Sequence, residues 1–124
     1  MISLETYKVL HILGVLLAFA SLGGLTLTVA NGAAKSTSSV RRLITISHGV
    51  STTVILLCGF GALARLDVMH GNIPGWVLVK LACWLVLGLL MAIPYRWPAL
   101  ARAVFWFLPV LGGTAAVMAI YKPF

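Results

Sequence analysis

Acidic residues are almost missing from this sequence. Among 124 residues there are two Asp or Glu side chains against nine Lys and Arg, and charged residues make up only 9% of the chain. Soluble domains are usually about 25% charged, so a soluble fold of this composition would expose large apolar surfaces. Both acids, Glu5 and Asp67, lie outside the long apolar stretches. Carboxylate-based proton coupling and acid–base catalysis inside those stretches are therefore not expected.

Cysteine is also scarce. Cys58 and Cys83 are the only two, and each lies within an apolar stretch. Without a C-x-x-C pair, neither a zinc ribbon nor a thioredoxin-type redox site is indicated. Because Cys behaves as a small hydrophobic residue when buried, both are expected to be free thiols. No Ser-His-Asp arrangement can be assembled at one depth either, which argues against nucleophilic catalysis.

Long apolar stretches are what the sequence has in abundance. Residues 10–34, 43–64 and 103–121 carry no formal charge, and residues 76–95 carry only Lys80. A helix needs about 20 apolar residues to cross a bilayer, and its backbone polar groups must be satisfied within the segment. The sequence therefore predicts an all-α fold, an integral membrane bundle of four transmembrane helices in one domain, 1–124. The predicted helices cover residues 7–29, 43–66, 75–94 and 99–121.

The excess of basic residues gives a net charge of +7. These residues are spread over predicted helix ends and short loops, where they can face lipid phosphates. No basic run is interleaved with aromatic residues, so nucleic-acid binding is not expected. The densest cluster, Lys35 with Arg41 and Arg42, lies in the first loop. Cytoplasmic loops carry an excess of Lys and Arg, which predicts that both termini lie outside the cytoplasm.

Ionisable residues inside a membrane span are costly and mark candidate functional sites. His11 lies about one turn inside the first predicted helix, and Lys80 lies slightly deeper in the third. On the same side lie Arg65 and His70. Together these four residues give the outer mouth of the bundle, the end that carries the chain termini, a net positive charge. Such a mouth can bind an anion such as a haem propionate, a lipid phosphate or a partner's carboxylate. In the simpler alternative, Lys80 and Arg65 extend to the headgroups while His11 hydrogen-bonds a neighbouring helix.

A haem site would have to be built around His11. His48 lies near the opposite end of the bundle, so the two histidines cannot share one iron across a core of about 30 Å. His48 is instead expected to pack inside and bond a neighbouring carbonyl. A single haem would be held by His11 together with His70 or Met69, or by His11 alone.

Several short motifs indicate a family. They are Lys8-Val9-Leu10-His11, Ser47-His48-Gly49, Leu56-Leu57-Cys58-Gly59 and Trp76-Val77-Leu78-Val79-Lys80, with Gly88 further on. In these the chain resembles the SirB-like small four-helix membrane proteins of bacteria, and more loosely the HemJ and CopD-like groups. The resemblance implies a bacterial cytoplasmic (inner) membrane location. HemJ-type proteins are linked to haem and protoporphyrinogen oxidation through a first-helix histidine and a third-helix lysine, which His11 and Lys80 match in kind. The SirB-like family implies no defined activity.

The function that these features favour is that of a non-catalytic membrane protein, an accessory or stabilising subunit of a larger membrane complex. Its expected partners are other integral membrane subunits and lipid. Small residues let helices approach closely in lipid, and Gly112, Gly113 and Ala116 are the predicted partner-facing set. The alternative is a haem-b-binding or porphyrin-handling redox protein that uses His11 with Lys80 and Arg65.

Overall fold

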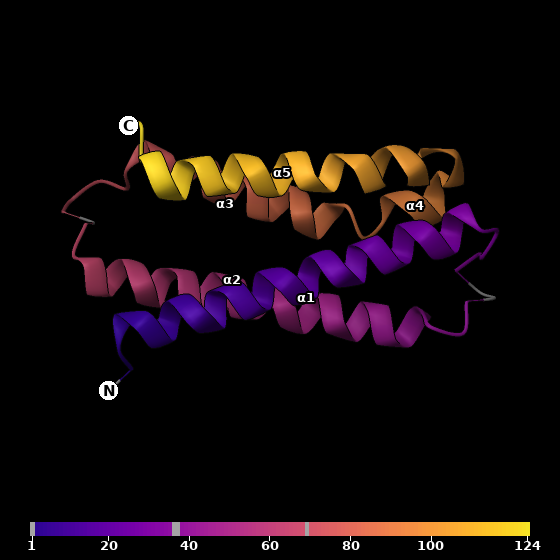
Figure 1. Ribbon diagram of the computed structural model, residues 1–124, viewed down its shortest axis with the longest axis horizontal. Coiled ribbons are helices and arrows are strands. Elements are labelled where there is room, and N and C mark those ends of the chain that lie inside the picture. Colours follow the sequence, from indigo (N-terminus) through magenta and orange to yellow (C-terminus); the bar gives the residue numbers. More distant parts are fainter. Residues whose placement is uncertain (1, 36–37, 69) are drawn as a thin grey trace.

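The computed structural model describes residues 2–35, 38–68 and 70–124 (Figure 1). Within these ranges the chain is helical and has no strands. Four helical spans are long and apolar enough to cross a membrane, which confirms the predicted all-α fold with four such helices. The third span combines α3 with α4, and the fourth combines η1 with α5. The elements are α1 (Leu4–Ala30), α2 (Arg41–Leu66), α3 (Gly75–Leu89), α4 (Ile93–Arg96), η1 (Pro98–Leu100) and α5 (Ala101–Tyr121).

Two helix boundaries differ from those predicted by more than two residues. α1 begins at Leu4 instead of residue 7, because the Ser3 hydroxyl accepts a hydrogen bond from the Thr6 amide at 3.2 Å and caps the first turn. α3 ends at Leu89 instead of residue 94. Pro94 has no amide hydrogen to donate to the carbonyl of residue 90, which favours a break in the helix just before it. The chain turns there and resumes as α4.

The helices form two hairpins. α1 packs closely along α2, and α3 packs against α5. The two helices approach closely at Gly14, where a Cβ atom would lie 3.0 Å from Ile55 Cγ1 and 3.2 Å from the Ser51 carbonyl oxygen. α1 runs diagonally and also meets α5, with Phe19 against Gly112 (Figure 1). Toward the end that carries both termini the hairpins diverge (Figure 1).

The buried core lies at the opposite end, beside the loops that join α1 to α2 and α3 to α5. α1 contributes residues from its second half, such as Leu22 and Leu25, whereas α2 contributes Ile44 near its start and Ile55 near its middle, and α5 contributes residues up to its middle. Pro94 in α4 is also fully buried there. The two hairpins are therefore held together mainly at this loop end.

Two hydrogen bonds join α2 to α3, although these helices otherwise make few contacts. The His48 Nε2 atom donates to the Leu87 carbonyl at 3.1 Å, and Trp84 Nε1 donates to the Thr52 carbonyl at 2.9 Å. His48 is buried, so the expectation of a packed histidine bonded to a carbonyl is confirmed. These bonds close the seam between the hairpins in the half nearer the core.

Large apolar side chains cover the outside of the bundle. Leu43 of α2, Leu89 of α3 and Trp106 of α5 are each more than 65% exposed. Water would disfavour such a surface, whereas the hydrocarbon of a bilayer accommodates it. This exposure is what four membrane-crossing helices require.

Candidate functional site

A cavity lies where the two hairpins diverge. Its volume is about 520 Å³, and α1, α2, α3 and α5 all contribute to its wall. Ligand sites for small molecules commonly measure about 300–1,000 Å³. The wall is mostly apolar and includes Val15, Phe19, Ile55, Leu81 and Trp84. A ligand of this cavity would therefore have a substantial apolar part.

Basic residues gather around this cavity near the chain termini. Lys8, Lys80 and Lys122 contribute to its lining together with His11. Lys80 and Lys122 lie close enough to repel one another, and the Lys122 ammonium also lies 5.5 Å from the centre of the Trp76 ring. Across the part of the chain that the structure describes, no carboxylate forms an ion pair with any of these lysines. Like charges held together without a counter-ion favour an anionic ligand.

His11 is fixed at the cavity wall by a hydrogen bond to α2. Its Nδ1 atom lies 2.9 Å from the Ile55 carbonyl oxygen. Because a carbonyl oxygen only accepts, this bond places a proton on Nδ1 and leaves Nε2 with a lone pair in the neutral ring. Gly59 makes room for the ring, since a Cβ atom there would lie 3.2 Å from His11 Cε1. The expected bond from His11 to a neighbouring helix is confirmed.

Two other residues of the predicted mouth lie elsewhere. The Arg65 Nε atom donates to the Ile2 carbonyl at 3.0 Å and ties the N-terminal segment to the end of α2. His70 lies 3.8 Å from an oxygen of the Asp67 carboxylate, and both side chains are exposed. Neither Arg65 nor His70 lines the cavity. The structure thus brings His11 and Lys80 together and leaves these two outside, while Met69 falls beyond the described residues.

The predicted partner-facing set is divided between two sides of α5. Gly112 lies against Phe19, where a Cβ atom would be 3.1 Å from the ring, and Ala116 lines the cavity. Gly113 alone has open space around it, with no heavy atom within 4 Å of a Cβ atom. The three residues do not form one outward face.

Sequence reasoning did not place Lys8, Lys122, Trp76 or Trp84 in the site, although all four line the cavity. The end of the bundle on which Lys122 lies could have been predicted from the topology. With four spans, the end of the fourth helix lies on the same side as the start of the third, so Lys122 and Lys80 share an end of the bundle. Which helix faces meet at that end depends on helix rotation, which the sequence does not specify.

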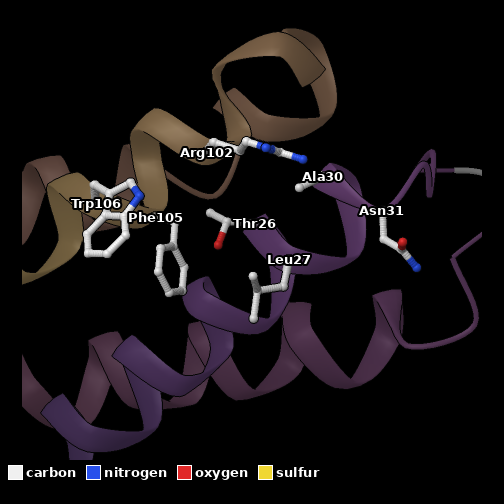
Figure 2. Close-up of a pocket in the computed structure, with 7 residues that line it drawn as sticks. All are labelled: Thr26, Leu27, Ala30, Asn31, Arg102, Phe105 and Trp106. Carbon is white, nitrogen blue, oxygen red and sulfur yellow. The ribbon is translucent and has the colours of Figure 1, made fainter.

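A smaller cavity of about 350 Å³ lies at the loop end, between the end of α1 and the start of α5 (Figure 2). Arg102 is the only charged residue in its lining, and its side chain extends over the end of α1 near Ala30 (Figure 2). The Thr26 hydroxyl, which also faces this cavity, donates to its own helix at the Gly23 carbonyl. With a single cation and no histidine, this cavity offers less chemistry than the one between the hairpins.

Neither a protein-built metal centre nor a known relative identifies the site. In residues 2–35, 38–68 and 70–124 there is no group of three His, Cys, Asp or Glu side chains that could hold a metal ion. Cys58 and Cys83 are free thiols, as the sequence predicted. No family model, curated protein or solved structure matches the chain.

Proposed function

We propose that this is a non-catalytic membrane protein that binds an amphiphilic anion in the cavity between its hairpins. The observation that carries the proposal is the pairing of an apolar wall with three lysines that have no carboxylate partner among the described residues. The protein lies in the bacterial inner membrane with both termini outside the cytoplasm. The mouth of the cavity then faces the outer leaflet.

Electrostatics favour an anionic head at this position. An unpaired ammonium inside a span is costly, and Lys80 lies five residues into α3, about 7.5 Å along the helix from its start. Bringing a phosphate or carboxylate to Lys80 and Lys122 relieves the repulsion between them. The apolar part of the same ligand then fills the cavity and makes van der Waals contacts with both hairpins where they diverge.

A fluorescent fatty acid and its neutral ester test this proposal directly. In detergent, parinaric acid should bind the purified protein more tightly than its methyl ester, because only the acid carries a charge. Lys80→Met should reduce that preference about fivefold, since one Lys near an anionic group contributes about 1 kcal/mol. Lys35→Met, which alters an exposed lysine of the first loop, is the matched control and should change nothing. Equal binding of acid and ester would contradict the proposal.

Haem b is one specific amphiphilic anion that the residues fit. Its macrocycle supplies most of the ligands of the iron, and His11, whose Nε2 atom has a lone pair, would hold the iron from the protein. A hydrogen bond from the other ring nitrogen to a carbonyl is the usual support for a metal-binding histidine, and His11 has that bond to Ile55. Lys80 and Lys122 would face the propionates. A bound haem supplies one-electron redox chemistry.

The visible absorption spectrum distinguishes haem from other amphiphilic ligands. Added haem should give a Soret band that His11→Ala shifts and weakens, because the axial ligand is lost. His70→Ala is the matched control, since His70 lies on an exposed loop beside Asp67. If the two variants give the same spectrum as the unaltered protein, haem is not held by His11.

A role as an accessory subunit is the second candidate, and open glycines favour it. Gly23 and Gly24 on α1, Gly49 on α2, Gly88 on α3 and Gly113 on α5 each have no heavy atom within 4 Å of a Cβ position. Close approach at small residues drives helix association in lipid, so these positions have room for helices of other membrane subunits.

Native gels of gently solubilised membranes test the subunit role. Gly113→Leu should release the protein from a larger complex without disturbing its own packing, because Gly113 has open space around it. Gly112→Leu would instead strike Phe19 within the bundle. A band at monomer size before any substitution would rule out the subunit role.

A further inference from the structure

The cavity opens sideways as well as at its mouth. Ile12 and Leu16 of α1 line it while being 55% and 61% exposed. On the facing helix, Ala116 and Ala119 of α5 also line it and are exposed. These four side chains therefore border an opening between α1 and α5, in the region where Figure 1 shows the two helices diverging. In a membrane this opening faces acyl chains, not water.

The dimensions of the opening match one leaflet of a bilayer. Along α5, the opening extends from Lys122, near the chain termini, to Gly112, where α5 contacts Phe19 of α1. Ten residues of helix separate Gly112 from Lys122, which is about 15 Å. The hydrocarbon core of a bilayer is about 30 Å thick, so one leaflet contributes about 15 Å. An acyl chain of that leaflet would extend from the lysines to the Phe19 ring.

From these features we infer that the ligand is an anionic phospholipid of the leaflet at the end that carries the termini. This inference rests on the proposed binding of an amphiphilic anion. The lipid enters sideways between α1 and α5. Its phosphate binds Lys80 and Lys122, and one acyl chain lies in the cavity against Phe19. The opening explains how a ligand that never leaves the bilayer reaches a site walled by all four long helices.

Fluorescence quenching can locate the acyl chain. Trp84 lines the cavity and is held by its bond to the Thr52 carbonyl, whereas Trp106 is 71% exposed on the outside of α5. Two single-tryptophan proteins, each with the other three tryptophans changed to Phe, are placed in phosphatidylcholine vesicles that contain a minor fraction of brominated-chain lipid. Brominated phosphatidylglycerol should quench Trp84 about fivefold more effectively than brominated phosphatidylcholine, the equivalent of about 1 kcal/mol. Trp106 should respond equally to both.

Two sets of variants separately test the lysine that binds the lipid phosphate and the sideways opening that admits the acyl chain. Lys80→Met should reduce the preference of Trp84 for the anionic lipid, while Lys35→Met retains it in full. Ala116→Phe with Ala119→Phe should protect Trp84 from both brominated lipids by filling the opening. Val117→Phe with Ile120→Phe is the control for the opening, because both residues are exposed and neither lines the cavity.

The outcomes separate this inference from the proposed function. Equal quenching of Trp84 by both lipids, together with a retained preference for parinaric acid, overturns the lipid assignment and leaves the amphiphile site in place. A Soret band that His11→Ala removes identifies haem as the occupant and likewise overturns the lipid assignment. Loss of both the lipid and the acid preference overturns the inference and the proposed function together.

Discussion

The two ends of this bundle are built differently. At the loop end the side chains interlock, with Leu22 and Leu25 fully buried and Pro94 packed beneath the corner between α3 and α5. At the end that carries the termini the hairpins diverge around a cavity of about 520 Å³, and lysines without carboxylate partners line it. Tight packing supplies stability, while a cavity and unpaired charges reduce it. One end therefore carries the stability of the protein and the other carries its proposed binding function.

The largest difference between the ends should be the side of the membrane that each faces. In a protein with Cys58→Ala and Cys83→Ala, single cysteines at Lys35 and Asn72 lie in exposed loops at opposite ends. An impermeant maleimide added to intact cells should label Asn72→Cys fully and Lys35→Cys hardly at all. The reverse pattern would invert the orientation, and labelling of both from one side would contradict the four-span arrangement.

Truncation of a large side chain should affect the loop end far more than the cavity end. Leu25→Ala empties a fully buried position and should lower the free energy of unfolding by about 2 kcal/mol or more. Leu81→Ala enlarges an existing cavity, so it removes few contacts and should lower that free energy much less. Unfolding by sodium dodecyl sulfate in mixed micelles measures both. Equal losses would mean that the cavity end is as tightly packed as the loop end.

Glycines on α1 provide a finer comparison. Gly14→Val would force α1 away from α2, because a Cβ atom at Gly14 meets Ile55 and the Ser51 carbonyl. We expect overpacking of this kind to cost about 1–3 kcal/mol. Gly24→Ala meets nothing within 4 Å and should stabilise the protein by up to about 1 kcal/mol, since Ala favours helix more than Gly does. The same unfolding assay applies, and a stabilising Gly14→Val would refute the close packing of α1 on α2.

The smallest expected effect concerns the seam between α2 and α3. Trp84→Phe keeps the ring but removes the hydrogen bond to the Thr52 carbonyl, and bonds between membrane helices contribute about 0.6 kcal/mol on average. Trp97→Phe is the control, because the Trp97 side chain is about half exposed and its indole nitrogen donates no hydrogen bond to any described residue. Indistinguishable unfolding curves for the two variants would show that the seam is not held by this bond.

The sequence predicts the helices well and their mutual arrangement poorly. Stretches without charge determine where the spans lie, so α2 at 41–66 and α5 at 101–121 fall within two residues of their predicted ranges. Local rules could have refined the other two, because Ser3 is a good N-cap and Pro94 favours an earlier helix end, although α5 does run through Pro109. The divergence of the hairpins could not be predicted. Lipid-facing and core-facing side chains are both apolar, so no polar face shows which residues point inward.

Of the four site residues that the sequence predicted, two line the cavity and two do not. His11 and Lys80 attract notice because each is ionisable within an apolar stretch, and both line the cavity. Arg65 and His70 share their end of the bundle but lie outside the cavity, since Arg65 bonds to Ile2 and His70 lies beside Asp67. Depth along a helix can be counted from the sequence, whereas direction around the helix axis depends on packing.

The length of α1 has a consequence for the kind of bilayer that suits this protein. Its 27 residues span about 40 Å, whereas the hydrocarbon core is about 30 Å thick. Its diagonal course (Figure 1) takes up part of this hydrophobic mismatch as tilt. A thicker bilayer would let α1 stand more upright, and its first half borders the cavity. The width of the cavity is therefore expected to depend on the chain length of the surrounding lipids.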